Sequence, residues 1–371
     1  MKTLITPVRT LVGVLFIFSG LVKADDPLGL SYKMQEFFEV WNFHWLDHYT
    51  LAFSIIMIGF EIVAGVALLL GWRIRLFSWL LLLLILFFTF LTGYAYLSGK
   101  VRECGCFGDC IPLTAGQSFA KDIILCLLIV FLFRYRDRIR PALPIKAAVG
   151  VLVAATFFSF LFQWYVLIHL PVIDCLPYKI GNNIPEKMQM PVGAIPDSTV
   201  ITMVYEKGGQ RLEFDATHFP ADFSDSTYKF VSRYDKLVRK GNAEPPIKDF
   251  VLSTGDNSDT TDAVLNAKGY TLALLVRQGE PKGNFSIIGA LAKHKNIPIL
   301  LVTSDYDNAV GWEARQGITW PVVKCDATAL KTAARADPTL YLLKKGTVLG
   351  KWSYADLDRA LPDLNALPDQ P

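Results

Sequence analysis

Charged residues are scarce in the first 171 residues, which contain 14 Lys and Arg and 10 Asp and Glu among long runs of Leu, Phe, Val and Ile. A soluble protein needs a polar surface, so this half of the chain is expected to face lipid. Neither half has the clustered basic face that nucleic-acid binding requires, which excludes nucleic acid as a partner. Histidine is rare, with 5 in 371 residues and none in the cysteine-rich loop at 104–110, which disfavours a metal site.

The rest of the chain has an ordinary polar composition. From residue 172 onward, 23 basic residues balance 24 acidic ones. A segment of about 200 residues is large enough to bury a hydrophobic core of its own. We therefore expect a membrane half followed by a soluble domain.

Five segments are apolar enough to span a bilayer, which takes about 20 residues of helix. They are residues 5–22, 51–70, 76–95, 119–133 and 147–168. The first also resembles a secretory signal peptide, because Lys2 and Arg9 precede its apolar stretch. We interpret it as a retained helix, and either interpretation leaves the later topology unchanged.

Orientation follows from the basic residues, because loops rich in Lys and Arg stay in the cytoplasm. When the loops between successive spans are assigned alternately to the two sides of the membrane, nine basic residues fall on one side and four on the other. The nine are Lys2, Arg9, Arg73, Arg75, Arg134, Arg136, Arg138, Arg140 and Lys146, and the four are Lys23, Lys33, Lys100 and Arg102. This bias predicts a multi-pass protein of a bacterial inner membrane, with a cytoplasmic N-terminus and a periplasmic C-terminal domain.

Four of the six cysteines are predicted to lie just outside the lipid, on the periplasmic side. Cys104, Cys106 and Cys110 belong to one short loop, and Cys175 follows the last span. That compartment is oxidising, and a disulfide between thiols separated by one residue is strained and easily exchanged. Three interpretations stay open: thiol-disulfide exchange, a structural disulfide between the loop and Cys175, and metal binding by three thiolates. We favour exchange and predict no metal site.

The other two cysteines are expected to be unreactive. Cys126 lies within the fourth span, where a lone thiol behaves as a small apolar side chain. Cys325 lies in the soluble half and is expected to be a core residue rather than a nucleophile.

Arg9, Glu61, Lys121 and Asp122 are ionisable residues within the predicted spans. An unpaired charge at Glu61 would be costly in lipid, so this residue is expected to be protonated or to pair with Arg9 or Lys121. A structural ion pair and a role in proton handling or quinone contact are both open. Lys121 and Asp122 are expected either to anchor their helix at the interface or to tune the thiols above them.

Two groups of residues in the first 140 positions carry a family resemblance. The first group is Arg9, Gly13, Phe16, Ser19, Gly20, Lys23, Asp26, Pro27, Gly29, Glu61, Gly65 and Gly71. These residues resemble DoxX proteins, which are small four-helix membrane proteins. The loop from Cys104 to Gly108, followed by Lys121 and Asp122, resembles the related MauE branch.

The resemblance implies a redox-associated membrane role. DoxX relatives are linked to sulfur and quinone chemistry, and MauE is required in methylamine utilisation, through disulfide formation in a periplasmic partner. Related disulfide-generating enzymes carry a Cys-x-x-Cys pair beside a quinone, and this chain has no such pair. Quinone is therefore unsupported as a cofactor, no other cofactor is predicted, and catalysis of the thiol-disulfide oxidoreductase kind is left open.

In the soluble half, strand-like segments alternate with helical ones and end in a hairpin and a helix, which predicts an α/β sandwich. A first hairpin is predicted at 199–214, around Gly208 and Gly209, and strands follow at 250–253, 271–277 and 299–303. Helices are predicted at 285–295, 308–316, 327–335 and 357–364, and the closing hairpin at 339–352.

The segment Asp337-Pro338-Thr339, leading into a strand, resembles the cis-proline segment of thioredoxin-like proteins. Where a thioredoxin carries its reactive cysteine pair, residues 278–283 contain no sulfur. The resemblance therefore implies that Pro338 helps to dock a partner chain rather than to catalyse.

These observations together predict an all-α membrane bundle followed by an α/β domain. The predicted divisions are a DoxX/MauE-like four-helix domain at 1–145, a fifth transmembrane helix at 146–170, a periplasmic linker and β-hairpin region at 171–245, and a thioredoxin-like domain at 246–371. The lipid bilayer and a periplasmic protein client are the predicted partners.

The predicted function is thiol-disulfide exchange with, or maturation of, that client through the external loop. Cys106 is expected to attack, Cys104 and Cys110 are candidates to resolve the mixed disulfide, and Cys175 is a fourth candidate. The alternative is a non-catalytic membrane scaffold or assembly factor whose cysteines are only structural.

Overall fold

The computed structural model describes most of the chain. The described residues are 2–99, 108–195, 198–215, 219–220, 222–224, 227–239, 241 and 244–369. Cys104 and Cys106 lie outside them.

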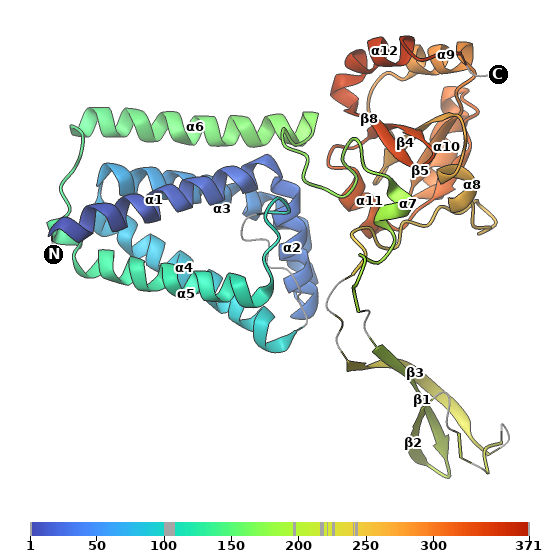
Figure 1. The fold of residues 1–371 in the computed structure, drawn as a ribbon, viewed down its shortest axis with the longest axis horizontal. Helices are drawn as coiled ribbons and strands as arrows, with labels where there is room; N and C mark the ends of the chain where they lie inside the picture. The colour runs from blue at the N-terminus through green and yellow to red at the C-terminus, as the bar shows by residue number, and fades with distance from the viewer. Residues whose placement is uncertain are drawn as a thin grey trace.

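Within the described residues, five helices are long and apolar enough to cross a membrane, which confirms the predicted spans. They are α1 (Lys2–Asp25), α3 (Thr50–Leu70), α4 (Ile74–Ser98), α5 (Ala115–Arg134) and α6 (Ile145–His169). Figure 1 shows α1 running beside α3, α4 beside α5, and α6 along the outside of the bundle. The first segment thus forms one continuous helix that packs into the bundle.

The helices α1 and α3 approach each other closely because glycine lines both sides of their contact. A β-carbon added at Gly65 would lie 2.8 Å from the carbonyl oxygen of Gly13 and 3.1 Å from the backbone nitrogen of Ile17. Backbone atoms cannot move aside as a flexible side chain can. Small residues of this kind allow close packing of helices in lipid, where apolar burial gives little driving force.

One helix lies across the end of the bundle instead of spanning it. The helix α2 (Pro27–Val40) and the short turn η1 (His44–Tyr49) lie at the end that faces the soluble domain (Figure 1). Asp26 caps α2, because its side chain accepts a hydrogen bond from the backbone N–H of Gly29, and Pro27 occupies the first turn. The Arg-rich turn η2 (Arg136–Arg138) lies at the opposite end, after α5.

The C-terminal domain is built on one five-stranded sheet of order β6-β5-β4-β7-β8, in which β4, β5 and β6 are parallel and β7 and β8 antiparallel. The strands are β4 (Tyr270–Val276), β5 (Ile299–Thr303), β6 (Val322–Lys324), β7 (Thr339–Lys344) and β8 (Thr347–Ser353). The helices are α7 (Ile184–Lys187), α8 (Thr261–Leu265), α9 (Ser286–His294), α10 (Tyr306–Gln316), α11 (Ala327–Ala333) and α12 (Leu357–Asn365), with the turn η3 (Tyr354–Asp356). The predicted α/β domain is confirmed.

Both faces of this sheet are buried, because successive side chains of a strand point to opposite faces. In β7, Tyr341 and Leu343 join one buried cluster, whereas Leu340 and Leu342 join the other. Tyr178 and Ile184, from the segment after α6, are buried in the first cluster. We therefore interpret the segment around α7 as part of the C-terminal domain.

A separate three-stranded antiparallel sheet projects from this domain (Figure 1). Its strands are β1 (Ser198–Lys207), β2 (Gln210–Asp215) and β3 (Lys229–Arg239), in the order β2-β1-β3. The predicted hairpin at 199–214 is confirmed, and β3 was not anticipated.

Two other details differ from the sequence-based expectation. Residues 250–253 do not form a strand; Ser253 makes only isolated bridges to Asp259 and Lys324. The edge strand β6 was not anticipated, because three residues are too few to show a periodic pattern.

We predict that Gly65→Leu destabilises the bundle by about 1–3 kcal/mol, because the added atoms force α1 and α3 apart. The measurement is the thermal unfolding midpoint of the purified protein in detergent. Gly150→Leu is the matched control, since a β-carbon at Gly150 in α6 would have no atom within 4 Å. Equal midpoints for the two variants would contradict the proposed close packing.

Candidate functional site

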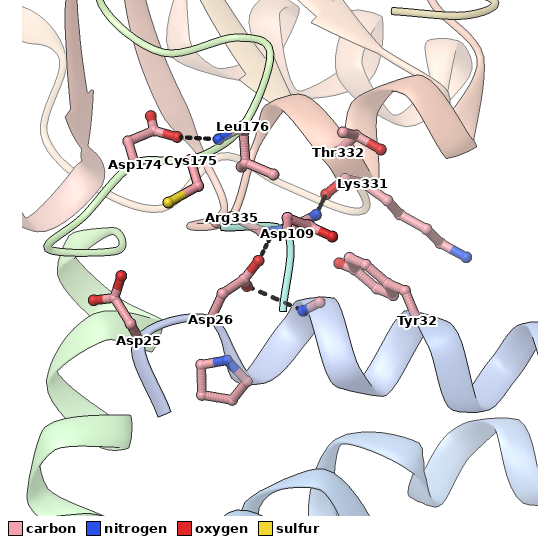
Figure 2. Close-up of polar contacts among 12 residues, drawn as sticks. Asp25, Asp26, Tyr32, Asp109, Asp174, Cys175, Leu176, Lys331, Thr332 and Arg335 are labelled. Atoms are coloured by element: carbon pink, nitrogen blue, oxygen red, sulfur yellow. Dashed lines mark hydrogen bonds and ion pairs between the residues drawn. The ribbon is translucent and has the colours of Figure 1, made fainter. Parts of the chain in front are cut away.

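The membrane and soluble halves meet at a polar junction at the end of the bundle where α2 lies. Figure 2 shows it: the end of α1 and start of α2 with Asp25 and Asp26, the loop residue Asp109, the segment with Asp174 and Cys175, and Arg335 from the soluble domain. Residues far apart in the chain therefore form one site.

A disulfide joins Cys110 to Cys175, with the two Cα atoms 4.9 Å apart. It ties the loop between α4 and α5 to the segment that follows α6. Of the predicted cysteine group, the structure thus brings Cys110 and Cys175 together. Cys104 and Cys106 lie outside the described residues, so their roles stay a prediction.

Arg335 is the central charge of this junction. Its guanidinium donates to Asp26 at 2.8 Å, to Asp109 at 2.9 Å and to the backbone carbonyl of Lys331 at 2.6 Å. The Arg335 side chain is only 4% exposed and its guanidinium carbon lies 5.4 Å from the centre of the Tyr32 ring. Burial alone lowers the pKa of Arg335, but the carboxylates of Asp26 and Asp109 outweigh it and raise the pKa.

The neighbouring acidic residues fix the segment that carries Cys175. Asp25 accepts hydrogen bonds from the backbone N–H groups of Val172 at 2.8 Å and Ile173 at 3.1 Å. Asp174 accepts from Lys351 of β8 at 2.8 Å. Asp174 also accepts from the backbone N–H of Leu176. The cysteine is therefore held on both sides by hydrogen bonds to charged residues, which hydrogen-bond strongly.

The end of the central strand β4 also faces the membrane domain. At the end of β4, the backbone N–H of Arg277 donates to Asp337 at 2.9 Å, and its guanidinium donates to the Tyr32 hydroxyl of α2. The bond between Asp337 and Pro338 is cis, as the sequence resemblance implied. Burial raises the pKa of Tyr32, so its hydroxyl stays protonated at neutral pH.

Within the bundle, the partner of Glu61 is Lys23, not Arg9 or Lys121. The Lys23 ammonium donates to the two carboxylate oxygens of Glu61 at 2.7 and 2.9 Å, and both side chains are almost fully buried. Arg9 lies near the other end of the bundle, where it donates to the backbone carbonyl of Arg140. Lys23 lies one residue beyond the predicted span 5–22, so its helix continues further than its apolar run.

Lys121 and Asp122 form a second ion pair, at 2.5 Å, and the hydroxyl of Thr92 donates to Asp122 at 3.0 Å. Asp122 is almost fully buried, whereas Lys121 is one-quarter exposed. The two ion pairs line one small cavity of about 60 Å³, together with Ser19 and apolar side chains. A cavity of this size has room for a few water molecules.

The two free cysteines of the described chain do not take part in the polar contacts of this junction. Cys126 is half-buried within the bundle, and Cys325 is buried in the core of the soluble domain. Burial raises the pKa of Cys325 to about 12. No group of three or more His, Cys, Asp or Glu side chains within the described residues is placed to hold a metal ion.

Sequence reasoning did not identify Asp26, Asp109 or Arg335 as interface residues. Arg335 lies 226 residues from Asp109 and 309 from Asp26, and no local pattern relates such distant positions. The adjacent acidic residues Asp25 and Asp26, directly after an apolar run, were the available signal for a polar junction.

Comparison with known proteins supports this architecture. Residues 1–135 match the family described as Methylamine utilisation protein MauE, and residues 199–240 match a Domain of unknown function (DUF8463). The chain is 29% identical over 157 residues to Protein TlpB of Flavobacterium psychrophilum. That similarity covers 42% of this chain and 43% of the relative, so the chain spans less than half of that protein. No solved structure matches the chain.

The chain is therefore a MauE-like multi-pass membrane protein with a further C-terminal α/β domain. The match covers the part of the chain that carries α1 to α5, the loop cysteines and both intramembrane ion pairs.

We predict that Arg335→Leu weakens the contact between the two halves by about 3 kcal/mol or more, because it leaves Asp26 and Asp109 without their cation. Hydrogen-deuterium exchange should rise at the start of α2 and at residues 172–176. Arg315→Leu is the control, because Arg315 pairs with Glu280 on an exposed surface and such pairs contribute about 0–1 kcal/mol. Unchanged exchange in the Arg335 variant would show that the junction does not depend on this residue.

We predict that Cys325 resists alkylation in the folded protein at pH 8, because a thiol with a pKa of about 12 is almost entirely protonated there. Mass spectrometry after iodoacetamide treatment, with and without urea, measures this. Rapid labelling without urea would contradict a purely structural role.

Proposed function

We propose that this redox-associated membrane protein exchanges disulfides with a protein client, through the external loop that contains Cys104 and Cys106. The observation that best supports this proposal is the Cys110–Cys175 disulfide, which fixes one end of this loop to the segment that leads into the soluble domain. In this proposal the disulfide is a structural staple, and the other two loop cysteines carry out the exchange.

The contacts around Cys110 and Cys175 support a structural role for their disulfide. Asp109, which precedes Cys110, forms an ion pair with the buried Arg335. Before Cys175, the backbone N–H of Ile173 donates to Asp25, and the Asp174 side chain accepts from Lys351. Exchange requires a thiolate to approach one sulfur from outside. Because both segments that carry the Cys110–Cys175 disulfide are held in place, this disulfide is better suited to stabilising the fold than to repeated opening and closing.

The exchange is written as two balanced steps. The Cys106 thiolate attacks a client disulfide, forms a mixed disulfide and releases one client thiolate. Cys104 then attacks the Cys106 sulfur, which forms the Cys104–Cys106 disulfide and releases the second client thiolate. The client gains two electrons and the loop loses two, and the reverse sequence oxidises a client dithiol.

The soluble domain has the features expected of a thioredoxin-like fold. Its central strand β4 lies between a parallel and an antiparallel neighbour, and the cis peptide bond before Pro338 directly precedes β7. We propose that it positions the loop and the client without taking part in the chemistry, because residues 278–283 contain no cysteine.

The proposed location is the bacterial inner membrane, with the soluble domain in the periplasm. The Arg-rich turn after α5 and the soluble domain lie at opposite ends of the bundle (Figure 1), as the distribution of basic residues requires. An oxidising compartment also suits a disulfide between Cys110 and Cys175.

A non-catalytic scaffold is the second candidate function. The observation that favours it is the same disulfide, because a staple between loop and domain needs no exchange partner. The Lys23–Glu61 and Lys121–Asp122 pairs are satisfied without a reaction as well.

We expect Cys104→Ser to accumulate a mixed disulfide between Cys106 and a client, because the resolving thiol is absent. The measurement is non-reducing electrophoresis and mass spectrometry of cells quenched with acid. Cys106→Ser should trap none through this position, and Cys126→Ser is the control for removing an unrelated thiol. The scaffold is favoured instead if no variant traps a client and a membrane-impermeant maleimide labels neither cysteine after mild reduction.

A further inference from the structure

A second cavity lies between α2, α3 and α4, next to the intramembrane ion pairs. It has a volume of about 400 Å³, which falls in the usual range for small-molecule sites. Thirteen of its fifteen lining residues are apolar, and seven of these are aromatic, including Phe37, Trp41 and Phe60. The two polar residues are Lys33 and Thr92.

This cavity opens on a face of the membrane-spanning helices, which we expect to meet lipid. Phe53, Ile56 and Phe87 line it from the membrane-spanning helices α3 and α4, and all three are exposed, Ile56 by 62%. The helix α2 covers the end of the cavity nearest the soluble domain. A molecule that enters must therefore be soluble in lipid.

One end of the cavity meets the two ion pairs Lys23–Glu61 and Lys121–Asp122, which we call the polar cluster. Phe88 lines both cavities, and the Lys23 ammonium lies 4.8 Å from the centre of its ring. Thr92 lines the large cavity and donates to Asp122, which lines the small one. An apolar site thus ends at hydrogen-bonding groups, as expected for a molecule with a polar head and an apolar body.

Among the described residues, the charges around this site balance. Each ammonium of the polar cluster pairs with a carboxylate, Lys23 with Glu61 and Lys121 with Asp122. Lys33 at the rim pairs with Glu36 at 3.4 Å. A charged head group would find no net opposite charge here, and burying it would be unfavourable. A neutral head group loses less hydration free energy than a charged one when it leaves water.

We propose that this cavity binds a neutral, bilayer-soluble amphiphile whose long apolar body lies among the aromatic side chains. Its carbonyl or hydroxyl head lies at Phe88 and Thr92. The Lys23 ammonium donates to both carboxylate oxygens of Glu61 and lies 4.8 Å from the centre of the Phe88 ring, so the head lies close to this ion pair. This binding is separate from the proposed exchange at the cysteine loop.

The test uses the full-length protein in nanodiscs and a long-chain alcohol that carries a photoactivatable diazirine in its chain. We expect saturable cross-linking to peptides of α2, α3 and α4. Unlabelled hexadecanol and a prenylated naphthoquinone, which are neutral hydroxyl and carbonyl compounds, should compete about tenfold better than ionised palmitate. The stronger of the two neutral competitors identifies the head group.

Leu84→Trp fills the cavity and should remove the saturable labelling. Leu83→Trp is the matched control, because Leu83 is the adjacent residue of α4, is 57% exposed and does not line the cavity. Thermal unfolding of both variants shows whether either of them is misfolded. The competition between the unlabelled compounds and the photoactivatable alcohol is measured on the unmodified protein, so it does not depend on either variant. Labelling that is not saturable, or that spreads evenly to the lipid-facing side of α6, overturns the proposal. Equal competition by palmitate overturns the neutral head group.

Discussion

The structure depends on one buried cation, Arg335, shared between two carboxylates of the membrane half. Asp26 begins α2 at the end of the first span, and Asp109 precedes the disulfide-bonded Cys110. A buried ion pair gives stability only when its geometry is good and its other donors are satisfied. Here the guanidinium donates to three acceptors, and two of them, Asp26 and Asp109, belong to the membrane half, so these bonds favour the observed orientation of the soluble domain on the bundle.

That orientation decides which surface of the soluble domain remains available. The end of β4 and the segment before β7 face α2, where Arg277 contacts Tyr32 and Arg335 contacts Asp26. In our proposal, the end of the sheet near Pro338, which the sequence assigned to a partner chain, faces the protein's own membrane half. The client then approaches the cysteine loop beside the contact between α2 and the sheet. The soluble domain acts on the loop by holding Asp109 and the segment around Cys175 in place.

The sequence predicted the spans and most strands and helices, because apolar runs and alternation are local signals. It offered a disulfide between the loop and Cys175 as one of three alternatives and did not identify Cys110 as the loop partner, since spacing alone does not choose among sulfur atoms. It named Arg9 and Lys121 as possible partners of Glu61 and missed Lys23, because Lys23 lies past the end of the apolar run. The contacts of Arg335 join positions hundreds of residues apart, and only the folded chain brings them together.

The positions of the buried charges relate the two halves to each other. The Lys23–Glu61 and Lys121–Asp122 pairs lie in the half of the bundle nearer the soluble domain, since Lys23 is near the end of α1 and Lys121 near the start of α5. Two residues beyond Lys23, the chain contributes Asp25 and Asp26 to the junction. The end of α1 therefore forms a rigid link between the polar cluster in the lipid and the junction above it. A molecule bound beside Phe88 and a client at the cysteine loop would both contact elements joined to the end of α1, so residues 23–26 form one route for coupling between them, beside the route through α2.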